Sequence, residues 1–267
     1  MSQKKHLSIL EFSRLTGIKR DNLRFYDRIG LLSPETRGEN GYRYYARRQL
    51  SAAYLIGSLR LLGVGLDTIR QYSSSRSPEK MLTLFARQEA SIQAEIAQLR
   101  ETSAIMKLYT QMAREALGHG KDELLLEERP RERIFLCPPI PAGMNEEDGG
   151  IYAYEYANEQ GINLGYPAGI LIPQETFTLD APSPTYHYYF KTGKKGNAWK
   201  PAGLYAVAYG RGAPDQSEAV YRRLLDFIRN QGLKTVGGAY EEFLLDELAV
   251  PDHEQFCVRV AVPVTRA

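Results

Sequence analysis

The feature that most constrains this fold is an unbroken helical segment of about 40 residues, which contains no glycine and, after Pro78, no proline. Ser77 is suited to cap such a helix, Pro78 to occupy its first turn and Gly118 to end it. A helix of this length would extend roughly 60 Å at 1.5 Å per residue, which is more than one small core can cover. The chain must therefore place separate modules on either side, at 1–76 and 121–267.

One face of this segment is mostly apolar. At helical spacing it carries Met81, Phe85, Gln88, Ile92, Ile96, Leu99, Ser103, Met106, Thr110, Ala113 and Leu117. Since so long an apolar face needs a partner helix, we predict that residues 77–120 form a dimerisation helix. The alternative is a helix that packs within its own chain, which the polar members of the face would permit.

Charged side chains are unevenly distributed along the chain. Residues 1–76 hold 14 basic and 6 acidic side chains, residues 77–120 hold 5 of each, and residues 121–267 hold 15 and 21. A basic segment favours a polyanion, because each phosphate that it neutralises releases condensed counterions. The charge alone would fit equally well a basic surface that only keeps the protein in solution.

The first residues of the chain show two short apolar stripes of helical spacing, separated at Gly17. This pattern predicts a helix-turn-helix, which can place its second helix in the major groove of DNA. The side chains left off the stripes are donors suited to phosphates and bases: Lys19, Arg20, Asn22, Arg24 and Arg28. A plain pair of surface helices is the alternative interpretation of this pattern taken alone.

The next segment contains Asn40-Gly41, a strong hairpin signal. It places aromatic and cationic side chains on a short ribbon: Arg37, Tyr42, Arg43, Tyr44, Tyr45, Arg47 and Arg48. This combination is expected where a wing lies along a phosphate backbone. For Tyr45 we expect packing within the ribbon instead. Two further helices, separated at 63–65, complete the head.

No stretch of the sequence approaches the ~18 consecutive apolar residues that cross a bilayer, and its first residues lack the long apolar run of a secretion signal. We therefore predict a cytoplasmic protein without a membrane partner. The two cysteines, Cys137 and Cys257, lie far apart and outside any CxxC or Cys/His cluster. The sequence thus supports neither a disulfide nor a thiolate metal site.

After the long helical segment the pattern changes to short β-prone runs divided by proline and glycine, with helical patterns interleaved twice. The stretch beginning at Asn158 resembles the stretch beginning at Asn230, about 71 residues later, and each contains a helix end, a glycine and a strand. This internal repeat predicts that residues 121–267 form a duplicated α+β domain with a cleft between its halves.

The C-terminal module is acidic, yet it holds 11 of the 18 tyrosines, six of the nine phenylalanines and the only tryptophan. Aromatic faces attract cations, and a carboxylate among them supplies the charge that holds a lipophilic cation. Glu241, in AYEEFLL, is the best candidate, because an unpaired carboxylate is costly in an apolar strand. Alternation puts Glu241 and Glu242 on opposite faces, and which one faces the pocket stays open. Alternatively, both are solvated and the tyrosines are ordinary core.

The run HLSILEFSRLTGIKRDNLRFYDRIGLLSP, the ribbon NGYRYYARRQL and the run LRLLGVGLDTI precede the long helix in this order. With them the chain resembles the MerR family of transcription regulators over residues 6–117. The resemblance implies a homodimer joined by an antiparallel coiled coil, each head reading half of a palindrome in promoter DNA. It assigns DNA contacts to Arg20, Arg24, Tyr26, Tyr42, Arg43 and Tyr44, with Arg60 near the backbone.

Members of that family act where the two RNA polymerase elements of a promoter are separated by an overlong spacer, and they kink and untwist the DNA to realign them. The resemblance therefore implies an activator with RNA polymerase as a partner. Metal sensors of the family carry cysteine ligands near the ends of the long helix, where this chain has none. We accordingly expect neither a metal nor another cofactor.

The segments KPAGLYAVAYGRGAP, LLDFIRNQGL, GGAYEEFLLDEL and FCVRVAVPV resemble the GyrI-like effector-binding domain of multidrug-sensing regulators. In that resemblance Glu241 matches the carboxylate that faces cationic drugs, and Tyr166 matches an aromatic wall. Glu254 and Phe256 fall near further wall positions. The aromatic pattern adds Tyr152, Tyr156, Tyr186 and Tyr188 as candidate pocket residues.

The sequence thus predicts an α+β protein with a winged helix-turn-helix head, a long coiled-coil dimerisation helix and a duplicated GyrI-like effector domain. We expect a ligand-responsive regulator of transcription, and not an enzyme, whose effector is an amphipathic cationic small molecule. Two alternatives stay open. One is hydrolase activity of the C-terminal domain, because some GyrI-like domains resemble hydrolases that use Tyr and Glu. The other is an effector-independent regulator whose pocket is filled by its own side chains.

Overall fold

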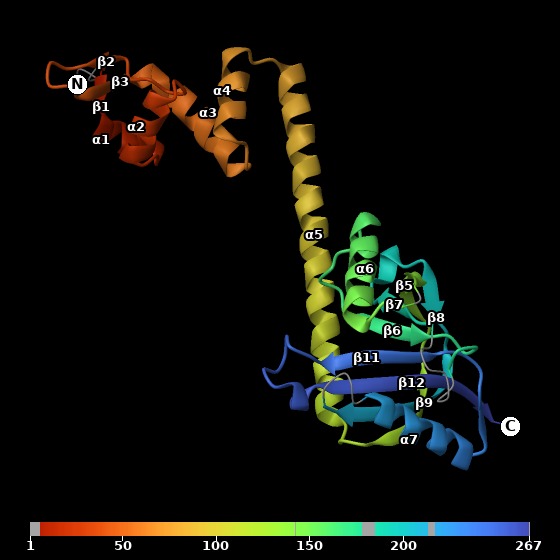
Figure 1. Cartoon of the computed structure of the whole chain (residues 1–267). Coiled ribbons are helices and arrows are strands. Elements are labelled where there is room, and N and C mark those ends of the chain that lie inside the picture. The colour runs from red at the N-terminus through yellow and green to blue at the C-terminus, as the bar shows by residue number, and fades with distance from the viewer. Residues whose placement is uncertain (1–5, 142, 178–184, 213–216, 267) are drawn as a thin grey trace. The chain divides into compact units, whose positions relative to one another are not determined.

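A computed structural model of the chain describes residues 6–141, 143–177, 185–212 and 217–266 (Figure 1). The chain divides into two compact units, Met1–Leu99 and Arg100–Ala267, and the long helix α5 (Pro78–Gly118) contributes to both. None of the helices in the described part combines the length and the apolar character needed to cross a bilayer. Helices and an antiparallel sheet together make an α+β protein, which confirms the predicted fold class.

The first unit is mainly helical. Its elements are β1 (His6–Ser8), α1 (Ile9–Thr16), α2 (Arg20–Arg28), β2 (Thr36–Arg37), β3 (Arg43–Ala46), the 3-10 turn η1 (Arg47–Gln49), α3 (Leu50–Leu61), α4 (Leu66–Ser74) and the first part of α5. Helix α1 begins with a capping box, in which the side chains of Ser8 and Glu11 each accept from the other's backbone N–H. It ends at Gly17, whose φ of 73° favours glycine.

The ribbon predicted for the head is confirmed, because β2 pairs with β3 in antiparallel register. A third strand, β1, pairs with the other edge of β3, so Leu7 lies on a strand and not on the helical stripe to which the sequence pattern assigned it. Tyr45 is fully buried and stacks on Phe12 with ring centroids 4.4 Å apart. Its predicted packing role is therefore also confirmed.

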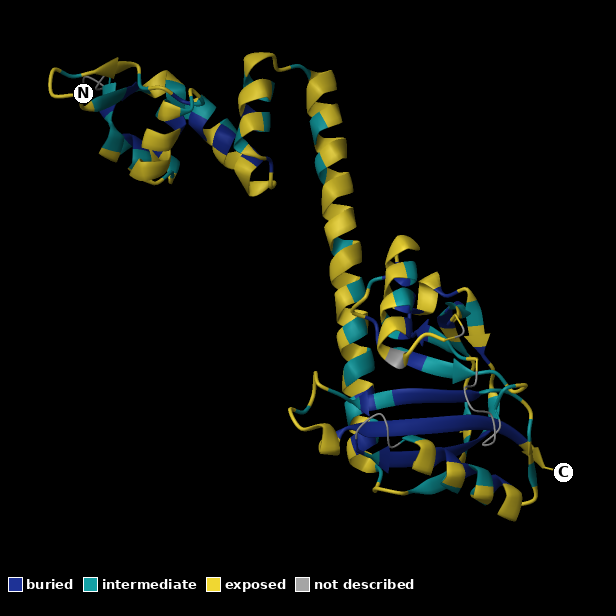
Figure 2. Cartoon of the chain, viewed as in Figure 1, coloured by how far each residue is buried: buried dark blue, intermediate teal, exposed yellow. Residues whose placement is uncertain are grey.

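The predicted long helix is confirmed as α5. The hydroxyl of Ser77 accepts the backbone N–H of Lys80 at 3.3 Å, and the helix extends to Gly118. Most of the helix between these ends is exposed (Figure 2). Met112 and Ala116, near its C-terminal end, are buried.

The second unit is built on one antiparallel sheet. Its elements after α5 are β4 (Leu124–Arg129), β5 (Glu132–Pro139), α6 (Glu146–Glu159), β6 (Ala168–Ile172), β7 (His187–Phe190), η2 (Gly193–Lys195), β8 (Ala198–Lys200), β9 (Gly203–Arg211), α7 (Ser217–Asn230), β10 (Leu233–Thr235), β11 (Ala239–Leu245), η4 (His253–Gln255) and β12 (Cys257–Arg266). The strand order is β4-β9-β12-β11-β6-β7-β5-β8, and β10 pairs with β12. Strands β4, β8 and β10 are short or half-exposed elements that the sequence pattern did not predict.

The two faces of the sheet have separate cores. On one face, Met112 and Ala116 of α5 pack with buried tyrosines that include Tyr205 and Tyr240. On the other face, α7 packs through Leu224 and its apolar neighbours against valines and alanines of β9 and β12. Successive side chains of one strand point to opposite faces and therefore into different cores. Glu241 and Glu242, which are adjacent on β11, consequently have different neighbours.

Candidate DNA-binding and effector-binding sites

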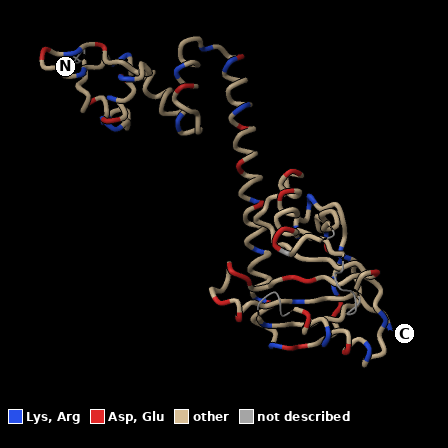
Figure 3. Tube along the Cα trace, in the orientation of Figure 1, with Lys and Arg blue, Asp and Glu red and all other residues tan. Residues whose placement is uncertain are grey.

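The predicted DNA-binding side chains lie on α2, on the ribbon and on α3 of the first unit, whose charged positions are marked in Figure 3. The exposed members are Lys19, Arg20, Arg24, Arg37, Tyr42 and Arg60, while Arg43 and Tyr44 are half-buried. Tyr26 is only 7% exposed and belongs to the core of the head, so little of its surface is available to DNA. Arg60 donates through Nη1 to the carbonyl of Val64 at 3.0 Å, which holds it at the turn after α3.

A buried carboxylate joins the ribbon to α2. Asp27, on α2, has a side chain that is 4% exposed, and its Oδ2 accepts from Nη2 of Arg37 and from Nε of Arg43, each at 2.6 Å. One carboxylate oxygen thus fixes the directions of two cationic side chains of the wing. The sequence prediction chose the two arginines but missed Asp27, because nothing local in LRFYDRIGLL shows that its carboxylate reaches a ribbon 10 to 16 residues away.

The second unit contains a cavity of about 210 Å³ that combines aromatic and acidic side chains, here called the aromatic-acidic pocket. Its aromatic members are Tyr109, Tyr154, Tyr188, Phe243 and Phe256, and its acidic members are Glu241, Asp246 and Glu247. Strand β11 pairs with β6 only as far as Glu241 opposite Ile170, although β11 continues to Leu245. Residues of both strands line the cavity, among them Gly169 and Ile170 of β6 and Glu241 and Phe243 of β11.

Glu241 lies at the buried end of this pocket with 6% of its surface exposed. Its Oε2 accepts a hydrogen bond of 2.6 Å from the hydroxyl of Tyr221 on α7. Burial, together with the charge of Glu241, raises the pKa of Tyr221 well above its usual value, so the tyrosine remains a neutral donor. At this contact Glu241 is therefore held in place by a neutral donor.

Asp246, which is half-buried, and Glu247, which is exposed, mark the solvent side of the pocket, here called its mouth, and concentrate negative charge there. Burial raises the pKa of Asp246, and the neighbouring Glu247 raises it further. Burial, followed by the charge of Asp246, also raises the pKa values of Tyr109 and Tyr154. Each raised pKa means that the ionised, negative form of the group is disfavoured in the pocket. A bound cation would stabilise those negative forms and so lower the pKa values again.

Glu242 has different surroundings, as alternation requires. It is 1% exposed and accepts from the hydroxyl of Tyr189 at 2.6 Å, from Nζ of Lys191 at 3.2 Å and from Nζ of Lys200 at 3.3 Å. Its other oxygen makes a short ion pair with Arg259. Burial would raise the pKa of Glu242, but the three cations hold it well below its usual range. Glu242 is therefore a compensated buried anion on the face opposite to Glu241.

Of the eight residues proposed as ligand contacts, the structure brings Glu241, Tyr188 and Phe256 together in the aromatic-acidic pocket. The others do not line it: Tyr152, Tyr156, Tyr166 and Tyr186 pack in or against the cluster around α6, and Glu254 is exposed on η4. Sequence reasoning missed Tyr109, Tyr154, Phe243, Asp246 and Glu247. The acidic pair directly follows AYEEFLL and is visible there in the sequence, whereas Tyr109 belongs to α5, outside the predicted effector domain 121–267.

Comparison with known proteins places these sites in context. A family-wide sequence profile described as "MerR family regulatory protein" matches residues 8–45. The Bacillus subtilis "Multidrug-efflux transporter 2 regulator" is 30% identical over 98% of this chain and 97% of its own length. The "Transcriptional regulator BrlR" of Pseudomonas aeruginosa is 25% identical over 97% of this chain and 99% of its own length. A cryo-EM structure of an EcmrR–DNA complex aligns with 98% of this chain and 100% of that chain, at 18% identity and a TM-score of 0.45.

Proposed function

The chain belongs to the MerR family of regulatory proteins, and on that premise we propose that it regulates transcription in response to an amphipathic cation bound in the aromatic-acidic pocket. The relatives support the proposal, since two that match nearly the whole chain at 30% identity are named regulators of multidrug-efflux transporters. The single observation that carries it is the pocket itself, which joins five aromatic rings to three carboxylates in about 210 Å³.

The chemistry of that pocket suits a lipophilic cation better than a neutral molecule. The faces of Tyr109, Tyr154 and Phe243 would attract a cation through their quadrupoles. Asp246 and Glu247 would draw the charge to the mouth, and Glu241 would meet it at the buried end. A cation with an apolar body would satisfy both the rings and the carboxylates, because water solvates such a molecule poorly.

We assign the DNA contacts to the head, at Lys19, Arg20, Arg24, Arg37, Tyr42, Arg43, Tyr44 and Arg60, with a small contribution from Tyr26. The basic head supports this assignment through its 14 Lys and Arg residues within 1–76. In this proposal the second helix α2 enters the major groove and the ribbon β2–β3 follows the phosphates. The link through Asp27 would fix the spacing between the two.

The proposed assembly is a homodimer through α5, with boundaries at 1–76 for the head, 77–120 for the helix and 121–267 for the effector domain. Along the predicted stripe, Met81, Phe85, Ile92, Leu99 and Met106 are all at least 38% exposed in the single chain. An exposed apolar row on a helix of 41 residues supports burial against a second copy. Two heads joined in this way would match a palindromic site.

The proposed mechanism is activation at a promoter whose spacer is overlong for RNA polymerase. The ligand can shift the dimer toward a DNA-distorting state only by the difference between its affinities for the two states. In a reconstituted reaction on such a promoter, benzyltriethylammonium should raise the transcript yield several-fold, whereas uncharged benzyl alcohol should leave it unchanged. A yield that does not respond to saturating cation would contradict the activation mechanism.

Replacing Arg43 by alanine should weaken binding to all DNA sequences alike and lower the slope of log affinity against log salt by about 1, as loss of one phosphate contact does. The bond from its Nε to Asp27 holds the guanidinium in a fixed direction on the ribbon. Fluorescence anisotropy on duplex DNA over a salt series measures both quantities. Arg229→Ala, at an α7 side chain that is 74% exposed, is the charge-matched control. An unchanged slope in Arg43→Ala would remove the assignment.

A further inference from the structure

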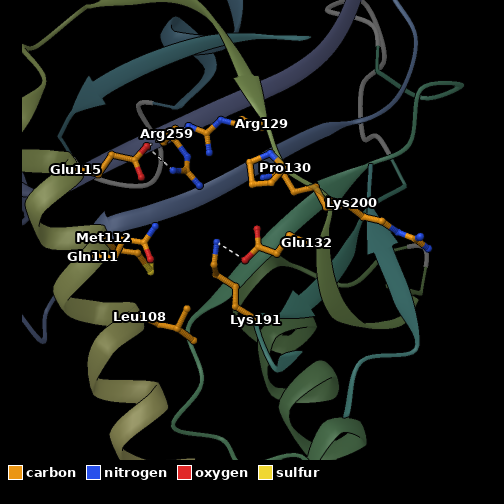
Figure 4. Close-up of a pocket in the computed structure, with 11 residues that line it drawn as sticks. Leu108, Gln111, Met112, Glu115, Arg129, Pro130, Glu132, Lys191, Lys200 and Arg259 are labelled. Atoms are coloured by element: carbon orange, nitrogen blue, oxygen red, sulfur yellow. Dashed lines mark hydrogen bonds and ion pairs between the residues drawn. The ribbon is translucent and has the colours of Figure 1, made fainter. Parts of the chain in front are cut away.

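A second cavity, of about 280 Å³, lies on the α5 face of the sheet in the second unit (Figure 4). Helix α5 contributes Leu108, Gln111, Met112 and Glu115 to its wall, and the strands facing the helix contribute most of the charged groups. None of its lining residues is shared with the aromatic-acidic pocket. We call it the cationic pocket for the reason given next.

Positive charge exceeds negative charge around this cavity. The cations that line it are Arg129, Arg131, Lys191, Lys200 and Arg259. Of the described residues, Glu115 and Glu132 are the only carboxylates that line it with them. Glu127 and Glu242 pair with these cations from outside the lining, so five cations share four carboxylates even when both are counted. The excess is one positive charge, and it depends on Arg131, an exposed side chain whose guanidinium lies 3.7 Å from the centre of the Trp199 ring.

Hydrogen-bond donors at the cavity also lack acceptors. Within the described part of the chain, Nε of Arg129 and Nε of Arg259 are buried and make no hydrogen bond. Arg259 is only 3% exposed, so water compensates its Nε poorly. A buried donor without an acceptor is costly, so the guanidinium groups of these two lining residues have hydrogen-bonding capacity that the protein does not use.

Lys200 shows the same excess of positive charge. It is 2% exposed, and its Nζ lies 4.5 Å from the centre of the Tyr240 ring and 5.9 Å from that of Tyr205. Burial lowers the pKa of Lys200 to about 8. The attraction of Glu242 and Glu132 opposes this shift, while the repulsion of Arg259 and Lys191 adds to it. An added anion would favour the charged form of the amine.

We propose that the cationic pocket binds a small organic anion with an apolar body, of the aromatic carboxylate class. Its carboxylate would accept from Arg259, Arg129 and Lys200, and its ring would rest on Leu108 and Met112. Glu115 holds the same two arginines, with Arg129 at 3.1 Å. The incoming carboxylate therefore competes with a side chain of α5, which makes this a second effector site that acts on the long helix.

The test is a calorimetric titration of the full-length protein with benzoate, with uncharged benzamide as the matched neutral probe. Benzoate should bind and benzamide should not. Gln111→Glu, an exposed position on the pocket wall, should weaken benzoate binding about tenfold through like-charge repulsion. Glu115→Gln should strengthen it severalfold, because it removes the competing carboxylate. Opposite effects of two isosteric changes on one helix cannot arise from misfolding.

Charge-matched controls are available on α7, at an exposed ion pair remote from the cavity lining. Arg222→Gln matches the charge change of Gln111→Glu, and Glu218→Gln matches that of Glu115→Gln. Both controls should leave the benzoate affinity within about twofold of the unaltered protein, since exposed pairs contribute little. If the control and test variants changed the benzoate affinity equally, or if benzoate did not bind at all, the proposed anion site would be wrong.

Two further readouts define the ligand class. If inorganic phosphate binds as tightly as benzoate, the apolar body plays no part and the proposed class is wrong. At pH 8 the amine of Lys200 should take up a fraction of a proton when benzoate binds, because the anion raises its pKa. This uptake is measured by repeating the titration in buffers of different ionisation enthalpy, since the observed heat of binding then changes with the buffer. Benzyltriethylammonium should bind the Gln111→Glu variant and the unaltered protein with the same affinity. A wrong assignment of the cationic pocket can therefore be told apart from a wrong assignment of the aromatic-acidic pocket.

Discussion

Replacing Glu242 by glutamine should lower the free energy of unfolding of the second unit by about 3–5 kcal/mol, the usual cost of removing one partner from a buried ionic cluster. Glu242 is 1% exposed and accepts from Lys191, Lys200 and Arg259, which are themselves 8%, 2% and 3% exposed. Glutamine keeps the size and the acceptor oxygen but removes the charge that compensates three buried cations. Urea unfolding followed by the fluorescence of Trp199, the only tryptophan of the chain, measures the change.

The pH dependence of this stabilisation has a definite sign. The pKa of Glu242 in the folded protein is held well below its usual value by Arg259, Lys191 and Lys200, against the opposing effect of burial. A carboxylate whose folded pKa is lowered contributes fully above its unfolded pKa, at roughly pH 5 and higher, and loses that contribution as the pH falls through the folded pKa. The difference between Glu242→Gln and the unaltered protein should therefore shrink in strong acid. It should also shrink as the pH rises toward 8, because Lys200, whose pKa burial already lowers to about 8, loses the opposing effect of Glu242 in the variant and gives up its proton more readily.

A second substitution distinguishes an ionic effect from general damage. Lys200→Met, added to Glu242→Gln, removes one of the cations left without compensation and should recover part of the lost stability. Glu218→Gln breaks an exposed pair with Arg222 and should change the free energy of unfolding by less than about 0.5 kcal/mol. If Glu242→Gln were as mild as Glu218→Gln, the cluster would not be the buried ionic core inferred here.

The local features of the fold were predictable because short-range physics determines them. Pro78 and Gly118 limit α5, and Asn40-Gly41 lies at the turn between β2 and β3. Strand β1 was not predictable in the same way, because His6–Ser8 becomes a strand only through pairing with Tyr44–Ala46, almost 40 residues away. A strand of three residues is too short to show an alternating sequence pattern, and its distant pairing partner cannot be recognised from the local sequence.

The roles of Glu241 and Glu242 show the same limit at the candidate site. Alternation correctly predicted that they lie on opposite faces, yet only their neighbours show that three cations surround Glu242 while a tyrosine hydroxyl donates to Glu241. Those neighbours come from distant elements: Tyr221 from α7, and Lys191 and Lys200 from segments about 40 to 50 residues earlier in the chain. Composition likewise predicted an acidic, aromatic effector module but could not choose among its tyrosines, since Tyr154 lines the pocket while Tyr152 and Tyr156 pack against the cluster around α6.

Replacing Glu241 by glutamine should weaken the binding of benzyltriethylammonium about 100-fold, the scale expected when a buried charge pair loses one partner. Glutamine can still accept from the Tyr221 hydroxyl through its amide oxygen, so the packing at the buried end of the pocket is retained while the charge is lost. Calorimetric titration of the full-length protein measures the affinity. Glu254→Gln, an exposed carboxylate on η4 outside the pocket lining, carries the same change in net charge and should bind the cation normally.

The acidic mouth of the pocket gives this prediction a second, independent measurement. The pKa of Asp246 is raised by burial and by Glu247, so its carboxylate becomes neutral at a higher pH than an ordinary aspartate. The affinity for the cation should therefore fall as the pH is lowered through that raised pKa, and Asp246→Asn should flatten this dependence. If Glu241→Gln bound the cation as tightly as Glu254→Gln does, charge at the buried end would play no part in recognition. A pH dependence that survived in Asp246→Asn would likewise remove the mouth from the mechanism, leaving the aromatic rings alone to hold the ligand.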